Sequence, residues 1–559
     1  MRQFISILFL LPQCVSLNIL LFLLGTNQFE RNIFEFLAQQ LALRHHNVIT
    51  VKPILIPEEP RLVKPKLHLV KEKTLKNLLP HFGLFRNMYV DLVKAGDVIP
   101  WKNEYEDEAY DEVYWTAHNA SCYKMLNSNL FDTLKKESLD VAIVYSGNPC
   151  QLAIAYVLAV PVIYFDLEGL SDETLVASNS PLNLDVPPSR CFLPSISFYN
   201  SLNRIRNGIC YMREFLIQSD IPVLSKLISR KYKLLSSPIA AMFAEDSALK
   251  KRFKTFPSTS TLLRSSSFFF VNTDPLLEYP RSLPPRVIHV GGLHIEHPRP
   301  LFAPWNTSIE SAEKGLIIVS LGTQANHAEM KEEQVKAIMG ALSELSSYRI
   351  YWRIGHKVQL KGLNEDNVPS HINLTTYLPQ NDLLAHKSCR LLVTNGGMAS
   401  LMEAVAHGVP IVGIPLYGSN DYNLRKAANK GLGLIVTKKD LSENNLLSAM
   451  KMVLQESKYQ MVAKEMSRAF RDRPSTPFDT ALHYIGLVGR HHGSAFLGET
   501  SVHPLITLNF DFFLIVLILF YLISYHCVRL LYVASRERIS LIIESPSDEN
   551  TNCSAKKNN

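Results

Sequence analysis

The sequence lacks several patterns that mark common functional classes. None of its eight cysteines forms a Cys-X-X-Cys pair, which argues against a zinc ribbon and a thioredoxin-type redox site. The net charge is +7, but no arginine-rich tract is interleaved with aromatic residues, so nucleic-acid binding is not expected. The adjacent His491 and His492 have no second ligand cluster elsewhere in the sequence, so we expect no metal.

Long runs without charge occur at both ends of the chain. Residues 1–16 combine a basic residue, an apolar run and small residues near Ser16, which is typical of a signal peptide, with a buried strand as the alternative. Residues 510–532 contain FFLIVLILFYLISYHCV, which with its flanks reaches the length of about 20 residues needed to cross a bilayer. The arginines that follow it predict that the tail, residues 533–559, lies in the cytosol.

The tail ends in Lys556 and Lys557 followed by two asparagines, which matches the di-lysine retrieval pattern of membrane proteins of the endoplasmic reticulum. These features together predict a single-pass type I protein of that membrane, with most of the chain in the lumen. Glycosylation is then expected at three acceptor sequons, those of Asn119, Asn306 and Asn373. Four luminal cysteines could form disulfides whose pairing the sequence leaves open: Cys122, Cys150, Cys191 and Cys210.

The luminal part has the alternation of an α/β protein. LNILLFLL (17–24) is apolar on both faces, as a central parallel strand should be, and is followed by a helical pattern and a second strand, NVITV. DVAIVY (140–145) and VPVIYFD (160–166) flank another helix. Residues 209–265 look helical and rich in basic side chains. We therefore predict an α/β domain over residues 17–290, in which a parallel sheet is covered by helices.

A second α/β domain is predicted over residues 311–498. RVIHVGGLHIEHPRPLFAPWNTS (286–308) is rich in Pro and Gly with little periodicity, and we place an interdomain linker at 291–310. From Gly315 the alternation restarts with six expected strands: GLIIVSLGT, RIYWRIG, HINLTTYLP, RLLVTNGG, VPIVGIPL and GLIV. Ligands of open α/β sheets bind beyond the carboxyl ends of the strands, where the loops after these segments converge. We therefore expect a substrate site at that edge.

Residues 377–423, YLPQNDLLAHKSCRLLVTNGGMASLMEAVAHGVPIVGIPLYGSNDYN, resemble the donor-binding signature of the UDP-glycosyltransferases. The membrane-bound animal UDP-glucuronosyltransferases are the most similar group. The resemblance extends to SLGT at 320, to FFFVNTDPLLEYPRSLPPRVIHVGGL and to RDRPSTPFDTALHYI, and its motifs are specific in the C-terminal half of the chain. It implies a GT-B fold of two Rossmann-like domains that bind the UDP-sugar in the second domain and the acceptor in the first.

The resemblance also assigns donor-binding positions. Tyr377 stands where the family stacks a Trp on uracil, and Gln380 where it hydrogen-bonds the base. Glu403 stands at the ribose-binding carboxylate, although a glutamate near a helix start also fits the helix dipole alone. The diphosphate is expected at Thr323 and at the amides around a Gly-Gly turn and the helix start near Ser400, namely Gly396, Gly397 and Ser400. No cofactor is implied, because the UDP-sugar is a substrate.

Several positions depart from the family pattern. Asn395 replaces the family's His before Gly-Gly, and an amide can donate a hydrogen bond but cannot become cationic. Ser419 and Asn420, in an expected polar loop, replace the sugar-contacting Asp-Gln. The identity of the sugar therefore stays open.

The catalytic positions also depart from the pattern. No His lies between residues 17 and 44, and Glu30 occupies the position of the family's general base. A Glu is a weak base unless burial raises its pKa, and a glutamate that only caps the helix is the alternative. Tyr145 stands where the orienting Asp should be. Six histidines are further candidates by residue type only: His45, His46, His386, His407, His491 and His492.

Three functions fit this sequence. The first is transfer of a sugar, by default glucuronic acid, from a UDP-sugar to a hydroxyl of a small lipophilic acceptor with inversion. The second is a catalytically impaired relative that binds a nucleotide or membrane partners. The third is a transferase that uses a different UDP-sugar and a different base. Association into homo- or hetero-oligomers stays open as well.

Overall fold

The computed structural model describes residues 16–23, 28–53, 69–75, 101, 108–145, 148–189, 201–219, 221–310, 312–322, 327–355, 359–363, 368–493 and 510–544. The chain divides into two compact units, Met1–Ser501 and Val502–Asn559. The expected signal peptide, apart from Ser16, lies outside the described residues, and so do Thr323, Cys191 and the di-lysine end.

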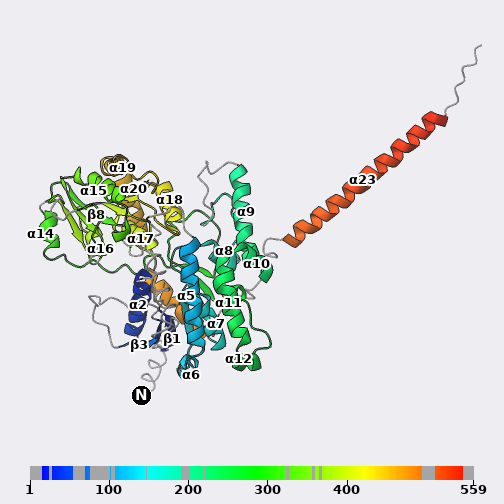
Figure 1. Cartoon of the computed structure of the whole chain (residues 1–559), viewed down its shortest axis with the longest axis horizontal. Coiled ribbons are helices and arrows are strands. Elements are labelled where there is room, and N and C mark those ends of the chain that lie inside the picture. The colour runs from blue at the N-terminus through cyan, green and yellow to red at the C-terminus, as the bar shows by residue number, and fades with distance from the viewer. Residues whose placement is uncertain are drawn as a thin grey trace, which may run out of the picture. The chain divides into compact units, whose positions relative to one another are not determined.

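The first unit contains two parallel sheets, and the first of these has seven strands (Figure 1). Their spatial order is β3-β2-β1-β4-β5-β6-β7, and every neighbouring pair is parallel. The strands are β1 (Asn18–Phe22), β2 (Asn47–Pro53), β3 (Lys71–Leu75), β4 (Val141–Tyr145), β5 (Val162–Asp166), β6 (Phe268–Val271) and β7 (Val287–His289). The four strands expected from the sequence in this half are confirmed.

Apolar periodicity explains how the first sheet is covered. β1 is central and its Ile19, Leu20 and Leu21 are fully buried, as a strand covered on both faces requires. The helix α2 (Gln28–Leu43) presents Leu37 and Leu41 at helical spacing to the same core. The expected strand-helix-strand unit at the start of this half is therefore present.

The helical stretch expected over residues 209–265 is also confirmed, and no strand interrupts it in the described part of the chain. It consists of α9 (Ser201–Ile217), α10 (Pro222–Ile228), the π-helix η1 (Tyr232–Ser236), α11 (Ser237–Glu245), α12 (Ser247–Arg252) and α13 (Thr259–Arg264). The other described helices of this half, besides α2, are α5 (Glu108–Leu126), α6 (Leu130–Lys135), α7 (Pro149–Val157) and α8 (Asp172–Ala177).

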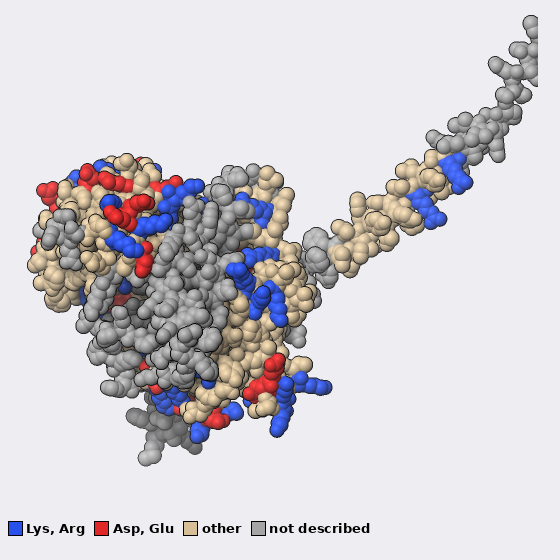
Figure 2. Space-filling view, viewed as in Figure 1, with Lys and Arg blue, Asp and Glu red and all other residues tan. Residues whose placement is uncertain are grey.

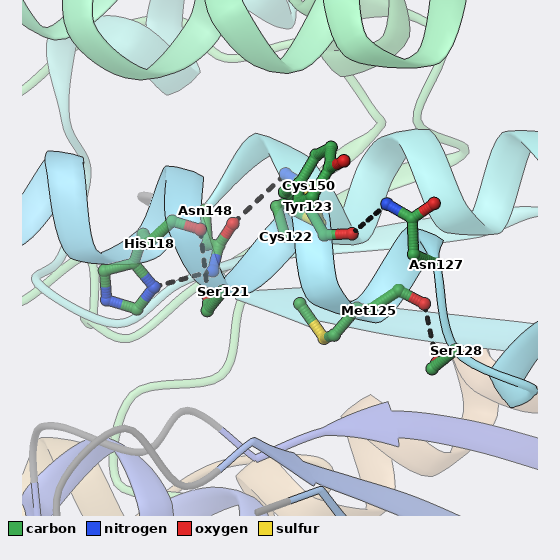
Figure 3. The surroundings of a disulfide bond; sticks show 9 residues. All are labelled: His118, Ser121, Cys122, Tyr123, Met125, Asn127, Ser128, Asn148 and Cys150. Carbon is green, nitrogen blue, oxygen red and sulfur yellow. Dashed lines mark hydrogen bonds between the residues drawn. A yellow bond between two sulfur atoms is a disulfide. The ribbon is translucent and has the colours of Figure 1, made fainter. Parts of the chain in front are cut away.

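One cysteine pairing that the sequence left open is resolved. Cys122 on α5 forms a disulfide with Cys150 on α7 (Figure 3). The bond joins a long helix to the short helix that follows β4. It therefore fixes the segment beyond the carboxyl end of a central strand.

The second sheet has six parallel strands in the order β10-β9-β8-β11-β12-β13. The strands are β8 (Gly315–Ser320), β9 (Tyr348–Arg353), β10 (Ile372–Thr375), β11 (Cys389–Thr394), β12 (Ile411–Gly413) and β13 (Gly433–Ile435). All six were expected from the sequence. Its helices and turns are α14 (Trp305–Glu310), η2 (His327–Glu329), α15 (Glu332–Ser343), α16 (Gln380–Leu384), α17 (Met398–His407), α18 (Asn420–Asn429), α19 (Glu443–Gln455) and α20 (Ser457–Arg471).

The stretch 286–308 is more regular than the sequence suggested. Its first residues form β7, which pairs in parallel with β6, and its last residues begin α14. The expectation of an irregular segment was wrong at these two places because the strand is only three residues long. A Pro/Gly-rich surrounding hides the periodicity of so short an element.

The last described helix of the first unit, α21 (Pro477–Arg490), returns from the second sheet to the first. Its Ala481, Ile485 and Val488 are completely buried in the core that also contains Leu17 and Ile19. Residues that follow the second sheet in sequence therefore complete the core of the first sheet.

Buried polar contacts also join the two halves. Lys426 Nζ on α18 lies 2.5 Å from Glu278 Oε1 in the segment after β6, and both side chains are almost fully buried. Arg473 pairs with Asp274 at 2.5 Å, and Asn423 Nδ2 donates to the Glu168 carbonyl at 3.3 Å. The first and third of these contacts hold α18 against the first half, and the second joins the segment after α20 to it.

The second unit is described by α23 (Phe510–Glu544). Within it, the 23-residue segment Leu514–Arg536 contains an 18-residue stretch with a mean hydropathy of 2.2 and is long and apolar enough to cross a membrane. The expected apolar segment is thus one continuous helix.

Candidate functional site

The turn between β11 and α17 lies at the carboxyl edge of the second sheet. Gly396 has φ +89°, a conformation that favours glycine, and its N–H donates to Thr394 Oγ1 at 3.3 Å. Gly397 is the N-cap residue of α17, which begins at Met398 rather than near Ser400. The turn therefore brings a helix N-terminus to the edge where ligands of such sheets bind.

A second reason for glycine at position 396 is the close approach of α18. A Cβ at this position would lie 2.4 Å from Leu424 Cγ and 2.8 Å from the Asn420 carbonyl oxygen. No side chain fits in that space. The Gly-Gly turn thus fixes α18 against the start of α17.

Three of the expected donor-binding side chains form one hydrogen-bonded cluster. Gln380, the first residue of α16, donates from Nε2 to Ser400 Oγ at 2.9 Å and to Glu403 Oε2 at 2.5 Å. The cluster comes from two helices, and the bonded residues are 20 and 23 positions apart in sequence. The sequence placed Gln380, Ser400 and Glu403 at one edge, and the structure brings them into direct contact.

The carboxyl group of Glu403 lies in an unusual electrostatic environment. Burial raises its pKa to about 7; the Gln380 hydrogen bond lowers the pKa, and the charge of Asp382 raises it. His294 Nε2 lies 3.7 Å from Glu403 Oε1, but burial lowers the pKa of this imidazole to about 4. His294 is therefore neutral near pH 7, and its contact with Glu403 is not an ion pair.

Asn395 and Asn420 are engaged with each other. Asn395 is 2% exposed, and its Nδ2 donates to Asn420 Oδ1 at 3.2 Å and to Tyr417 Oη at 3.4 Å. Asn420 Oδ1 also accepts a hydrogen bond from the Tyr417 amide at 3.3 Å. The family has His at the first of these positions and Gln at the second. In this chain the two positions form a neutral, buried pair of amides.

Asn420 does not lie in the polar loop that the sequence suggested, whereas Ser419 lies in the turn directly before the helix. Asn420 is the first residue of α18 and Ser419 precedes it. The expectation failed because the Asn420 side chain accepts from the Tyr417 amide and so closes a tight turn directly before the helix. Ser419 Oγ accepts from Asn423 Nδ2 at 3.4 Å.

Tyr377 has a different setting from the other site residues. It is 60% exposed and stands between β10 and Gln380, where its carbonyl oxygen accepts from Thr375 Oγ1 at 2.6 Å. Its ring is therefore accessible to a planar ligand. Thr323, the other expected phosphate contact, lies outside the described residues.

The expected catalytic positions lie at the first sheet. Glu30 belongs to the first turn of α2, and its side chain lies outside what the structure describes. Tyr145 ends β4 and is 6% exposed, and its amide donates to Gln151 Oε1 at 2.9 Å. Asp140 accepts from the Asn18 amide at 2.7 Å, which agrees with a structural role at the other end of the strand.

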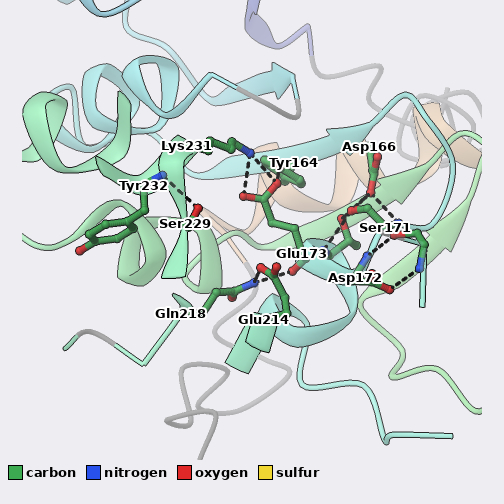
Figure 4. Close-up of polar contacts among 12 residues, drawn as sticks. Tyr164, Asp166, Ser171, Asp172, Glu173, Glu214, Gln218, Ser229, Lys231 and Tyr232 are labelled. Atoms are coloured by element: carbon green, nitrogen blue, oxygen red, sulfur yellow. Dashed lines mark hydrogen bonds and ion pairs between the residues drawn. The ribbon is translucent and has the colours of Figure 1, made fainter. Parts of the chain in front are cut away.

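Two ionisable groups near this edge were not found from the sequence. His118 on α5 lies 3.0 Å from Asn148, and burial lowers the pKa of its imidazole to about 4 (Figure 3). Asp166, at the end of β5, accepts from Ser171 and Thr174 at 2.5 and 2.6 Å (Figure 4). Burial raises the pKa of Asp166 to about 6, against the lowering effect of these hydrogen bonds. A polar residue directly after a buried strand was the available signal for Asp166.

The expected glycosylation sites have different surroundings. Asn373 is exposed on the edge strand β10, and Asn306 lies partly exposed on α14. Asn119 lies within α5, where its Oδ1 is buried and Ser121 of the same sequon is 2% exposed. Asn373 is therefore the most accessible acceptor of the three.

The fold has solved neighbours among glycosyltransferases. The spinosyn forosaminyltransferase has a TM-score of 0.53 at 15% identity, covering 85% of this chain and 100% of its own. The calicheamicin glycosyltransferase CalG4 has the same TM-score at 14% identity, with 85% and 99% covered. Such low identities define the fold alone. The expected GT-B arrangement of two Rossmann-like halves is thus confirmed.

Sequence comparison identifies the family. The family model described as UDP-glucoronosyl and UDP-glucosyl transferase matches residues 72–536, and the chain belongs to this family. It is 29% identical over 419 residues to the 2-hydroxyacylsphingosine 1-beta-galactosyltransferase of Mus musculus, covering 73% of this chain and 71% of the relative. It is 26% identical over 390 residues to the UDP-glucuronosyltransferase 1A3 of Homo sapiens, covering 69% and 67%.

A third relative matches a smaller part. The chain is 32% identical over 238 residues to the UDP-glucosyltransferase 2 of Dactylopius coccus. The match covers 43% of this chain and 45% of the relative, which is less than half of either protein. The three relatives are named for three different sugars. The comparisons therefore establish the family and leave the donor sugar open.

Proposed function

We propose that this protein binds UDP-sugars at the carboxyl edge of its second sheet and transfers the sugar to an acceptor hydroxyl. The observation that carries the proposal is the cluster of Gln380, Ser400 and Glu403 beside the N-terminus of α17. A carboxylate next to a helix N-terminus offers hydrogen-bond acceptors for the ribose and donors for phosphate oxygens at one place.

Each group has a specific part in the proposed complex. The two ribose hydroxyls donate to Glu403, the Gln380 amide bonds the base, and the exposed ring of Tyr377 stacks on it. The amides of residues 396–400 receive the diphosphate, where the helix dipole favours negative charge. Thr323 would complete this phosphate site.

Transfer requires an activated hydroxyl. In the proposed reaction, a base removes the proton of the acceptor hydroxyl, whose oxygen attacks the anomeric carbon and displaces UDP with inversion. Glu30 is the candidate base, and glucuronic acid is the first donor to test, with a small lipophilic hydroxyl compound as acceptor. We further propose that α23 anchors the enzyme as a type I protein in the membrane of the endoplasmic reticulum, with the two sheets in the lumen.

Two observations favour a second function, nucleotide binding without transfer. Asn395 and Asn420 bond each other, and Tyr145 replaces the acid expected to orient a base. In such a relative, Gln380 and Glu403 would retain UDP while turnover is lost.

Two measurements separate these functions. Calorimetric titration of the detergent-solubilised full chain with UDP tests the site, and no binding at millimolar UDP would exclude both functions. A screen of UDP-glucuronic acid, UDP-glucose and UDP-galactose against phenolic acceptors tests transfer. Turnover supports the enzyme, and binding without turnover with any donor supports the second function. In an active enzyme, unchanged turnover in Glu30→Gln would remove Glu30 as the base.

A further inference from the structure

Exposed apolar side chains gather on two adjacent helices, α9 and α10. Outside α23, fourteen large hydrophobic residues are exposed among the described residues, and six of them lie between positions 202 and 227. These six are Leu202, Ile205, Ile209, Ile221, Val223 and Leu227. Isolated exposed apolar residues are normal on a protein surface, but a cluster of this kind marks an interaction site.

The exposed residues follow one side of α9. Leu202, Ile205 and Ile209 are spaced by three and four positions and are 63–67% exposed. The opposite side of the helix carries Tyr211 and Phe215, each 1% exposed. The helix is therefore apolar on both its inner and its outer side, and the inner side alone is used by the core.

The short helix α10 continues this surface. Val223 and Leu227 are 80% and 82% exposed, while Ser225 between them is buried and donates to the Ile217 carbonyl of α9 at 2.9 Å. Arg213 of α9 donates to the Ile228 carbonyl at 3.4 Å. Because these bonds hold α10 to the end of α9, the two exposed apolar faces are neighbours.

The same segment is strongly basic. Residues 201–233 contain seven Lys or Arg and two Asp or Glu. Lys226, Arg230 and Lys233 are exposed, and Figure 2 shows Lys and Arg side chains gathered around the position of α10. Apolar side chains bordered by cations are suited to a lipid surface. The apolar side chains enter the headgroup region, and the cations bind phosphate groups.

The connection between the first unit and α23 is short. Twenty residues separate Gly493, the last described residue of the first unit, from the start of the apolar segment at Leu514. A fully extended connection of that length reaches about 70 Å. With α23 in a membrane, even a weak affinity of α9 and α10 for lipid therefore acts at a high effective concentration.

We propose that α9 and α10 form a second membrane contact, which docks the first unit on the surface of the bilayer that holds α23. Leu227 and Val223 enter the headgroup region, and Lys226, Arg230 and Lys233 lie at the level of the phosphates. This contact involves none of the nucleotide-site residues and does not depend on the proposed transfer activity.

Photo-cross-linking in the full chain tests this contact. The protein is reconstituted through α23 into phosphatidylcholine vesicles with and without phosphatidylserine, with p-benzoylphenylalanine at position 227 or, as a control, at the exposed Met461 of α20. We expect about tenfold more lipid adduct at 227 than at 461, and more with phosphatidylserine. Equal lipid yields at the two positions, or adducts at 227 that join two copies of the chain, would overturn the proposal.

A double variant tests whether the patch acts as one surface. With the probe at Ile209, the changes Val223→Glu and Leu227→Glu should reduce the lipid adduct about tenfold. The matched changes Met452→Glu and Met461→Glu, also at exposed positions, should leave it unchanged. Unaltered unfolding temperatures show that each variant is folded. An adduct at Ile209 that survives the first pair of changes contradicts the proposal.

Discussion

The protonation of a single carboxyl group, Glu403, controls the proposed uridine site. Its pKa of about 7 means that near neutral pH the group is partly protonated before a ligand arrives. A protonated carboxyl is a weaker acceptor for the two ribose hydroxyls than the carboxylate, because one of its oxygens carries a proton. Binding of the nucleoside therefore favours the ionised form and lowers the pKa.

Uridine affinity should consequently rise with pH. From about pH 5.5 to the pKa, we expect about a tenfold gain per pH unit, followed by a plateau above pH 7.5. Uridine is used in place of UDP because it has no phosphate that titrates in this range. Calorimetry at several pH values measures the effect. Glu403→Gln should bind more weakly and without this slope, and a flat wild-type profile would contradict the assignment.

The two glycines before α17 should respond differently to alanine. Gly396→Ala forces a left-handed backbone on an L-residue and a clash with Leu424, so we expect a loss of about 2–5 kcal/mol of unfolding free energy. At Gly397 the nearest atom to a new Cβ is 3.6 Å away and φ is −60°, so Gly397→Ala should cost less than about 1 kcal/mol. Urea unfolding measures both, and equal losses would contradict this account.

Between elements, the most consequential contact joins α18 to the segment after β6. Burial alone would raise the pKa of Glu278, but the cation of Lys426 holds it below the ordinary value. Lys426→Met leaves this carboxylate buried without its cation and should cost about 3–5 kcal/mol of unfolding free energy. Denaturant unfolding measures the loss.

An exposed pair on the same helix provides the control. Arg425 and Asp421 are 2.6 Å apart but partly solvated, so Arg425→Met should cost less than about 1 kcal/mol. The double variant Lys426→Met, Glu278→Gln should recover most of the loss, because no buried charge then remains unpaired. If Lys426→Met costs no more than Arg425→Met, the buried pair does not hold the two halves together.

Elements with buried apolar runs were predictable from the sequence, and short or charged ones were not. β1, β4 and β8 are apolar on both faces and were all expected. β3 has the charged sequence KEKTL, which is possible because an edge strand needs no apolar face. β7 has only three residues. Neither carries the periodicity by which a strand is found in a sequence.

The candidate site was predictable to a similar degree. Gln380 and Glu403 were placed at one edge by strand order and resemblance, and they touch. The bond between Asn395 and Asn420 was not predictable, because it depends on how closely α18 approaches the turn. His294 was missed as well, since it follows the short strand β7 in a stretch without periodicity and reaches Glu403 only in the folded chain.

At the scale of the whole molecule, the two sheets should unfold together. α21 is part of the core of the first sheet, and Lys426 and Arg473 cross between the halves. At UDP concentrations 100-fold above Kd, we expect amide protons of β4 and β11 to gain the same stability, about 2.7 kcal/mol. Hydrogen exchange followed by mass spectrometry measures both strands.

Ile485→Ala provides the complementary test. It removes buried apolar atoms from the first sheet's core and should lower the opening free energy of both strands by about 2–5 kcal/mol. Protection by UDP that is confined to β11, or destabilisation confined to β4, would show two independent units.

The return of α21 to the first sheet has a consequence for how the protein is made. The last strand of that sheet ends at His289, but its core lacks Ala481, Ile485 and Val488 until roughly two hundred further residues have been synthesised. At about 5–20 residues per second, this takes about 10–40 s. During that interval a nearly complete parallel sheet exposes an apolar face, so the nascent chain offers a binding site to chaperones until α21 emerges.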